Sequence, residues 1–328
     1  MTEKYTLLVT CGHLQRHIGC FREELMGHGV ECWVPQLAGQ QFTEAEMIQM
    51  VPGADILIAG DDPLGANVLS AGRAGKLSGI VRWGIGTDNV DKSAASALGL
   101  PVYNTPGMFS NEVADLAMGH VLNLARHIHK MDRDVRRGEW TRYEGTSLSG
   151  KTVGIVGLGG IGQEVARRAR AFGMTVLGSD VVSIDPAVLS RLEIDQRPFD
   201  ALLAGADIVI IACNLTPDNR HLFNAAAFAR MRQGAMLVNV ARGPIVDEDA
   251  LADALESGQV GAAGLDVFEE EPLPMSSRLR AFDNCLFGTH SGSSTSQGIG
   301  RTNRKSVDIA LAMLGIGSGS LAEYHRVA

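Results

Sequence analysis

Polar side chains follow three strand-like runs in the second half of the sequence, and their types suit carboxylate binding and proton transfer. Arg242 follows the apolar run 236–240, an acidic stretch lies at 266–271, and His290 comes after a third run. A guanidinium can bind a carboxylate through two hydrogen bonds and polarise a neighbouring carbonyl. A histidine exchanges one proton near neutral pH, and a carboxylate beside it would fix its tautomer and favour imidazolium. Each residue alone also fits a structural role, so the prediction rests on their occurring together.

A glycine-rich loop in the middle of the sequence has the spacing of a dinucleotide-binding turn. It lies between a strand-like run and a helix-like run, and its residues are Gly157, Gly159, Gly160, Ile161 and Gly162. The first two glycines permit a tight turn and a close approach of backbone to a pyrophosphate. The third lets helix pack on strand, and free N–H groups at the start of the helix can bind the phosphates. This order of strand, loop and helix predicts a dinucleotide site.

An acidic residue after the next strand-like run favours NAD over NADP. The run 175–178 ends at Ser179 and Asp180, eighteen residues after Gly162. A carboxylate at that place would accept hydrogen bonds from the ribose hydroxyls and repel the 2′-phosphate of NADP. The residues that follow, Val181 and Val182, provide no arginine for that phosphate. The alternative is an aspartate that only closes a turn at the end of the strand.

Strand-like and helix-like runs alternate along the whole chain, which indicates parallel α/β sheets. We expect strands at 5–9, 31–34, 55–59, 80–82, 100–103, 152–156, 175–178, 208–212, 236–240, 262–265 and 285–287, with long helices at 110–131 and 297–314. Ser110 and Asn111 are candidate N-caps. The predicted fold is two doubly wound parallel-sheet domains with a cleft between them: a flavodoxin-like substrate domain (1–104 and 292–328) and a Rossmann NAD domain (105–291). Ligands of such sheets bind beyond the carboxyl ends of the strands.

Composition and charge exclude several classes of protein. The chain has 328 residues, of which 45% are hydrophobic and 20% charged, as in globular enzymes. A net charge of −8 disfavours nucleic acid and anionic membranes as partners. No apolar run is long enough to span a membrane, and the first residues do not resemble a signal peptide. These features predict a cytoplasmic protein.

The cysteines predict neither disulfides nor a metal site. They are odd in number, scattered, and without a pair separated by two residues. Four potential ligands cluster near the N-terminus, where a strand turns into a helix: Cys11, His13, His17 and Cys20. Because nothing else there is typical of a structural zinc module, we predict no bound metal.

The sequence resembles the D-isomer-specific 2-hydroxyacid dehydrogenases. Its motifs are most similar to those of the phosphoglycerate dehydrogenase-like branch without a regulatory domain. The resemblance covers nearly the whole chain. It rests on ordered motifs at 82–91, 104–107, 157–162, 237–243, 246–248, 266–268, 271–272 and His290.

The resemblance implies roles for individual residues. The catalytic set would be Arg242, Glu271 and His290, with Glu271 preferred over Glu269 and Glu270 because the family's glutamate immediately precedes a proline. The substrate carboxylate would bind Arg242 and the backbone N–H groups of Gly84, Ile85 and Gly86. Besides the glycine loop and Asp180, the cofactor would contact Cys213, Pro217, Val240, Ala241, Asp266, Ser291 and Gly292. A homodimer through the NAD domain is also implied, and Trp140 either reaches a partner subunit or only packs on the rim.

Departures from the family bear on the substrate. Thr289 precedes His290 where the family often has proline, and Asp115 replaces a usual glutamate. Asp61 and Asp62 stand where phosphoglycerate-specific members carry arginines, and two aspartates would repel a substrate phosphate. The predicted reaction is therefore reversible, NAD-dependent hydride transfer at C2 of a small D-2-hydroxy or 2-oxo acid. The alternatives are 3-phosphoglycerate oxidation, phosphite oxidation, and a nucleotide-sensing corepressor without catalysis.

Overall fold

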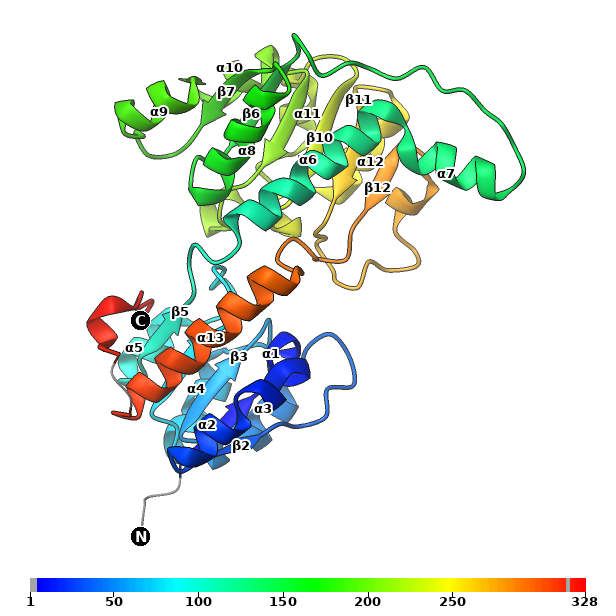
Figure 1. Cartoon of the computed structure of the whole chain (residues 1–328). Helices are drawn as coiled ribbons and strands as arrows, with labels where there is room; N and C mark the ends of the chain where they lie inside the picture. Colours follow the sequence, from blue (N-terminus) through cyan, green and yellow to red (C-terminus); the bar gives the residue numbers. More distant parts are fainter. Residues whose placement is uncertain (1–4, 317–318) are drawn as a thin grey trace. The chain divides into compact units, whose positions relative to one another are not determined.

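The chain forms two compact α/β units, which are described separately (Figure 1). The computed structural model describes residues 5–316 and 319–328. Unit 1 consists of Met1–Met108 and Thr295–Ala328, and unit 2 consists of Phe109–Ser294. The domain boundaries predicted from the sequence are 104/105 and 291/292.

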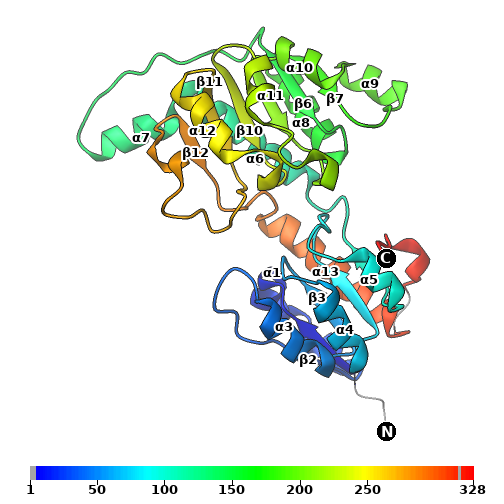
Figure 2. The same cartoon turned by 180° about the vertical axis from the view of Figure 1, so that it is seen from behind.

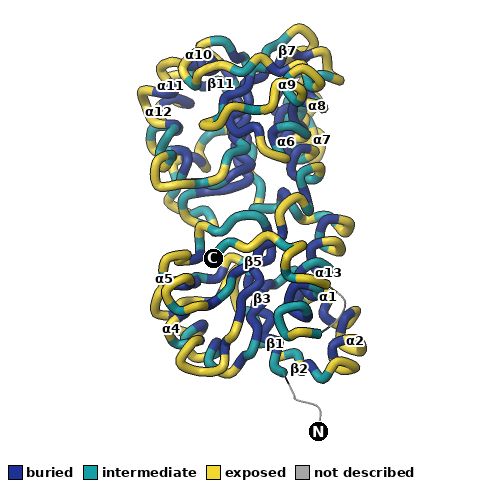
Figure 3. The backbone as a smooth tube through the Cα atoms, turned by 90° about the vertical axis from the view of Figure 1, so that its left-hand side faces the viewer, coloured by how far each residue is buried: buried dark blue, intermediate teal, exposed yellow. Residues whose placement is uncertain are grey.

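Unit 1 contains a five-stranded parallel sheet in the order β2-β1-β3-β4-β5, the flavodoxin-like order that the sequence predicted. Its strands are β1 (Tyr5–Val9), β2 (Val30–Trp33), β3 (Ile56–Ala59), β4 (Gly79–Arg82) and β5 (Val102–Asn104). All residues of β3, β4 and β5 are buried, because helices cover both faces of the sheet (Figure 3). Continuous apolar runs are typical of strands in this setting.

The helices of unit 1 divide between the two faces of this sheet (Figures 1 and 2). They are α1 (Gly12–His17), α2 (Arg22–Gly27), α3 (Glu44–Met50), α4 (Ala66–Ala74), α5 (Lys92–Ala97) and α13 (Ser296–Met313), with 3₁₀ turns at Ile18–Cys20, Val51–Gly53 and Leu321–Glu323. Helix α13 packs on β3 and β4, and a side chain on Gly79 would collide with Met313. The last residues of the chain pair with β5, where Arg326 forms an antiparallel bridge with Tyr103.

Unit 2 contains a seven-stranded parallel sheet in the order β12-β11-β10-β9-β6-β7-β8. Its strands are β6 (Thr152–Val156), β7 (Thr175–Ser179), β8 (Ile194–Gln196), β9 (Ile208–Ile211), β10 (Ala235–Asn239), β11 (Val260–Leu265) and β12 (Cys285–Phe287). Six of these strands lie where the sequence predicted them, and β8 was missed. The order of strands reverses at the β6/β9 pair, which is where Rossmann folds bind nucleotides.

Helices also cover both faces of the second sheet (Figures 1 and 2). They are α6 (Ser110–Arg126), α7 (Ile128–Arg136), α8 (Gly160–Ala171), α9 (Pro186–Leu192), α10 (Phe199–Gly205), α11 (Ala225–Arg230) and α12 (Glu248–Glu256), with 3₁₀ turns at Pro217–Asn219, Gly243–Ile245 and Arg278–Ala281. Helices α6 and α8 pack against each other and against strands β6, β7, β10 and β11.

The prediction of one long helix at 110–131 was wrong. His127 adopts a left-handed conformation with φ of 53°, which ends α6 and begins α7. The Asn123 side chain accepts the backbone N–H of His129 at 2.9 Å, so this N–H does not continue the helical ladder. The predicted caps were also wrong, because the N-cap position is occupied by Phe109 and no side chain caps the helix.

His120 on α6 is a buried histidine in a setting that disfavours its charged form. It is 4% exposed, and a Cβ on Gly264 of β11 would lie 3.0 Å from its own Cβ. Neither ring nitrogen has a hydrogen-bond partner within residues 5–316 and 319–328. Burial lowers the pKa of His120 from 6.5 to about 4.

We expect unit 2 to lose stability as the pH falls from 6.5 towards 4 because of His120. Between pH 6.5 and 4, the His120 ring is protonated in the unfolded chain but stays neutral in the folded chain. Above pH 6.5 the ring is neutral in both states, so it does not affect stability there. The loss between about pH 7.5 and about pH 5 is about 2 kcal/mol. Urea unfolding of His120→Leu should lack this component, and His28→Leu, a change at an exposed position, should retain it. The same pH dependence in His120→Leu and the unmodified protein would contradict the assignment.

Candidate functional site

The glycine loop after β6 is shaped by close backbone contacts and leaves one side open. Gly157 has φ of 96°, and a Cβ there would lie 2.6 Å from the backbone of Cys213. A Cβ on Gly162 would lie 1.9 Å from the Gly157 carbonyl oxygen. By contrast, a Cβ on Gly159 would meet no described atom within 4 Å. Helix α8 begins at Gly160, so its free N–H groups face this open side and suit a pyrophosphate.

Asp180 lies beside this loop at the end of β7. Its Oδ2 accepts the N–H of Leu158 at 2.7 Å, and its Oδ1 accepts the N–H of Val182 at 3.1 Å. Each carboxylate oxygen can accept a second hydrogen bond. The carboxylate is therefore held in place by backbone and can still bind ribose hydroxyls. Val181 and Val182 next to it are exposed, which suits an apolar rim for an adenine base.

Asp180→Ala should narrow the preference for NAD over NADP. The variant removes both the acceptor for the ribose hydroxyls and the charge that repels the 2′-phosphate. We expect the ratio of kcat/KM for the two cofactors to fall by on the order of tenfold or more. Steady-state kinetics with each cofactor would measure it, with Asp195→Ala on β8 as the control. An unchanged ratio would refute the ribose role.

The remaining predicted cofactor residues follow the strands next to the glycine loop. Cys213 follows β9, Pro217 opens a 3₁₀ turn, and Val240 and Ala241 follow β10. Burial raises the pKa of the Cys213 thiol to about 11, so the thiol is protonated near neutral pH. It can contact a ligand as a neutral side chain but is not suited to act as a nucleophile. The structure brings these residues to the same edge of the sheet as Gly157.

Arg242 is held at the end of β10 by hydrogen bonds with Asn239 and Ala241. Its carbonyl accepts the Asn239 side-chain amide at 2.9 Å, and its Nη1 donates to the Ala241 carbonyl at 2.9 Å. The next residue, Gly243, lies directly against the backbone of Phe268, since a Cβ there would lie 1.8 Å from the Phe268 carbonyl carbon. This contact joins the loop after β10 to the loop that carries Glu271.

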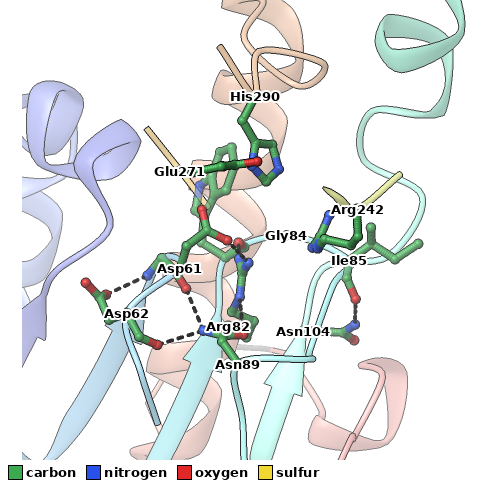
Figure 4. Close-up of polar contacts among 12 residues, drawn as sticks. Asp61, Asp62, Arg82, Gly84, Ile85, Asn89, Asn104, Arg242, Glu271 and His290 are labelled. Carbon is green, nitrogen blue, oxygen red and sulfur yellow. Dashed lines mark hydrogen bonds and ion pairs between the residues drawn. The ribbon is translucent and has the colours of Figure 1, made fainter. Parts of the chain in front are cut away.

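His290 and Glu271 form a hydrogen-bonded pair in unit 2 (Figure 4). His290 Nδ1 lies 2.8 Å from Glu271 Oε2, and the two side chains are 28% and 21% exposed. Glu271 Oε1 accepts the N–H of Phe268 at 3.0 Å, which orients the carboxylate. Since a carboxylate only accepts, Nδ1 carries the proton and Nε2 remains to exchange one with a substrate. Of the other two glutamates, Glu269 pairs with His221 and Glu270 is exposed.

Asp266 organises the loop that carries His290. Its carbonyl accepts the N–H of His290 at 2.7 Å, and its two carboxylate oxygens accept the N–H groups of Ser291 at 3.0 Å and Gly292 at 2.9 Å. His290 itself has φ of 53°, a conformation that non-glycine residues rarely adopt. Burial raises the pKa of Asp266, although the two N–H groups oppose this. Asp266 thus positions the histidine, in addition to its predicted contact with the cofactor.

The residues predicted to bind the substrate carboxylate through a nest of backbone N–H groups, Gly84, Ile85 and Gly86, lie in unit 1. The N–H of Gly84 donates to Thr105 Oγ1 at 2.8 Å, so it serves the fold. The N–H groups of Ile85 and Gly86 have no hydrogen-bond partner in the described part of the chain. Two adjacent N–H groups of this kind can bind a carboxylate. Among the described residues, the N–H groups of Ile85 and Gly86 therefore remain available to a carboxylate, whereas that of Gly84 is already hydrogen-bonded.

The sequence predicted that Asp61 and Asp62 would both repel a substrate phosphate, but in the structure both carboxylates are bound by other protein groups. Asp62 is 1% exposed and accepts hydrogen bonds from the Thr10 hydroxyl at 2.6 Å and the N–H of Phe42 at 3.0 Å. Its carboxylate is therefore a structural group. Asp61 is ion-paired with buried Arg82, as Figure 4 shows. The guanidinium is bound within the fold, so the pair offers no net positive charge to a phosphate.

The described residues hold no candidate metal-binding group and no candidate membrane-spanning helix. No group of three or more His, Cys, Asp or Glu within the described residues is arranged to hold a metal ion, including the cluster near Cys11. Over the same residues, none of the helices has both the length and the apolar composition needed to cross a bilayer.

Comparison with known proteins decides the family. The chain matches the sequence model of the D-isomer specific 2-hydroxyacid dehydrogenase NAD-binding domain over residues 118–292. It is 36% identical to a hydroxypyruvate reductase of Thermotoga maritima over 286 residues, which cover 86% of this chain and 92% of that protein. The chain belongs to the D-isomer-specific 2-hydroxyacid dehydrogenase family. This confirms a dehydrogenase that uses NAD and acts on the CH–OH group of 2-hydroxy acids.

Other relatives of this 2-hydroxyacid dehydrogenase differ in length. It is 39% identical to a D-3-phosphoglycerate dehydrogenase of Methanocaldococcus jannaschii over 260 residues, which cover 78% of this chain and 49% of that protein. The chain thus spans about half the length of that relative. A glyoxylate reductase structure from Paecilomyes thermophila superposes with a TM-score of 0.84 at 27% identity, covering 98% of this chain and 99% of that one.

Proposed function

We propose that this dehydrogenase interconverts a short D-2-hydroxy acid and its 2-oxo acid, with His290 as the acid and base. The observation that carries the proposal is the pair of His290 and Glu271, which shares one unit and one sheet with the glycine loop. The chemistry of the loop fits a dinucleotide, because Gly157 and Gly162 are required by backbone contact and Gly159 leaves room for a phosphate group. Bound NAD would supply the hydride acceptor for oxidation at C2, and NADH the hydride donor for reduction.

The protein's own groups handle the proton and the carboxylate. In oxidation, Nε2 of His290 takes the proton of the substrate hydroxyl, and in reduction it gives that proton back to the carbonyl oxygen. Glu271 stabilises the imidazolium that forms in between. Arg242 binds the substrate carboxylate, which fixes the position of C2. For the N–H groups of Ile85 and Gly86 in unit 1, we propose carboxylate binding as well.

The preferred substrate class is a short 2-oxo acid with no second negative charge. The Asp61–Arg82 ion pair is neutral as a whole, and Arg82 also donates to Asn89 at 3.1 Å, so it is not available for a phosphate. Hydroxypyruvate and glyoxylate fit this class, and proteins of those names are similar to this chain over most of its length. Phosphorylated 3-carbon acids do not fit it.

A panel of 2-oxo acids tests the proposal. NADH oxidation should be followed with glyoxylate, hydroxypyruvate, pyruvate and 3-phosphohydroxypyruvate. We expect turnover of glyoxylate, hydroxypyruvate and pyruvate. The kcat/KM for 3-phosphohydroxypyruvate should be at least about tenfold lower than for these acids. Tight NADH binding with no turnover across the panel would favour a nucleotide-sensing corepressor. NAD reduction by phosphite instead would favour phosphite oxidation.

We further propose a homodimer formed through unit 2 and action in the cytoplasm. Ile128 and Val135 of α7 and Trp140 after it are 48%, 55% and 81% exposed, which is unusual for large apolar side chains. The five cysteines are all free, in keeping with a reducing compartment. Light scattering of the protein and of Trp140→Ala would test whether this surface lies between two copies.

A further inference from the structure

The C-terminal residues of the chain lie along the edge of the sheet that carries the carboxylate nest. The N–H of Val327 donates to the Val102 carbonyl at 2.7 Å, and the N–H of Asn104 donates to the His325 carbonyl at 3.2 Å. Tyr324 makes a cation–π contact with Lys305 of α13, whose Nζ lies 4.3 Å from the centre of the ring. This register places His325 opposite Asn104, the last residue of β5.

The side chains of His325 and Asn104 continue this pairing towards the nest. His325 Nδ1 lies 2.7 Å from Asn104 Oδ1, and Asn104 Nδ2 donates to the Ile85 carbonyl at 2.8 Å. The second of these bonds is drawn in Figure 4. Because an amide oxygen only accepts, Nδ1 of His325 is the donor, whether the ring is neutral or protonated. His325 therefore directs the Asn104 oxygen towards the tail and the Asn104 nitrogen towards Ile85.

The geometry of the peptide group links the Asn104 hydrogen bond to the orientation of the N–H groups of Ile85 and Gly86. In a trans peptide the C=O and the following N–H point in opposite directions. The Gly84 carbonyl accepts the N–H of Thr105 at 3.0 Å, which turns the Ile85 N–H away from β5. The Ile85 carbonyl is held by Asn104, which turns the Gly86 N–H away from β5 in the same manner.

We propose that His325 is a positioning residue for the substrate carboxylate, acting through Asn104 and the Ile85–Gly86 peptide. This inference rests on the proposed role of the nest. It makes His325 part of the substrate-binding apparatus, although its side chain does not touch substrate. Asn104 is 4% exposed and has both ends of its amide bound, so it transmits the orientation with little freedom.

Kinetics of His325 variants test the proposal. His325→Leu should raise KM for the 2-oxo acid about 2- to 10-fold, with kcat and the Kd for NADH unchanged. His325→Asn should restore the KM of the unmodified enzyme, because its amide nitrogen replaces Nδ1 at the same distance along the side chain. Arg326→Ala is the matched control, since that side chain donates to the Ala328 carbonyl and not to β5.

A double-mutant cycle distinguishes the effect of His325 through Asn104 from the effect of the Ile85 and Gly86 N–H groups themselves. If His325 acts through Asn104, His325→Leu should have no further effect on KM in an Asn104→Ala background. An unchanged KM in His325→Leu, or an equal rise in both backgrounds, would overturn the proposal. If Asn104→Ala itself turns over substrate with normal KM, the nest assignment fails. If Asn104→Ala raises KM and His325→Leu does not, only the role of His325 fails.

Discussion

Replacing His290 by glutamine should lower kcat for 2-oxo acid reduction by about 10²- to 10⁴-fold. Glutamine keeps a polar group of similar reach but cannot deliver a proton to the carbonyl oxygen. NADH should bind with unchanged Kd, because the glycine loop lies on other strands of the sheet. Stopped-flow measurement of hydride transfer, together with NADH fluorescence titration, would give both quantities. Undiminished turnover in His290→Gln would remove this residue from the mechanism.

Glu271→Gln provides the matched companion to this variant. The amide can still accept the Nδ1 proton of His290, so the ring should keep its orientation, but the charge that stabilises imidazolium is gone. The rate of reduction should therefore begin to fall at a lower pH than in the unmodified enzyme. Glu270→Gln, at an exposed neighbour, should leave the profile in place. Identical pH profiles in all three proteins would show that Glu271 does not act on the histidine.

Adding a methyl group at Gly159 should weaken NADH binding by at least about tenfold without destabilising the protein. Gly159 has φ of −68°, which alanine adopts freely, and its Cβ would meet no described protein atom within 4 Å. The methyl group would instead occupy the space in which a phosphate must approach the backbone. Isothermal titration with NADH and thermal melting of the protein alone would measure the two effects.

Gly157→Ala is the contrasting variant. Its Cβ would lie 2.6 Å from backbone atoms of Cys213, and its φ of 96° is unfavourable for alanine. We expect this change to lower the melting temperature of unit 2 even without cofactor. If Gly159→Ala bound NADH normally, the open side of the loop would not be the phosphate site.

The strands were predictable because their physical signal is local. Apolar runs bounded by turn residues located β6 and β12 to the residue. Strand β8 was missed because Asp195 and Gln196 make up most of its three residues at the edge of the sheet. The break at His127 was missed because a left-handed turn at a histidine depends on a side-chain contact that no sequence periodicity reports.

The residue types of the proposed site could be read from the sequence, but their hydrogen bonds could not. Arg242, Glu271 and His290 follow strand ends, and a resemblance to a family singled them out. The use of the Gly84 N–H by Thr105 could not be seen, because the two residues meet only when β4 and β5 pair. Asn104 and His325 were missed as partners for the same reason, since their contact joins residues 221 positions apart.

The discontinuity of unit 1 has a consequence for how the protein is made. Unit 2 is one unbroken stretch, Phe109–Ser294, whereas unit 1 needs both the first part of the chain and α13. During synthesis the apolar faces of β3 and β4 therefore remain uncovered until Met313 and its neighbours emerge, by which time unit 2 is complete. We therefore expect unit 1, whose synthesis begins first, to complete its folding last, and we expect a chaperone to act on it.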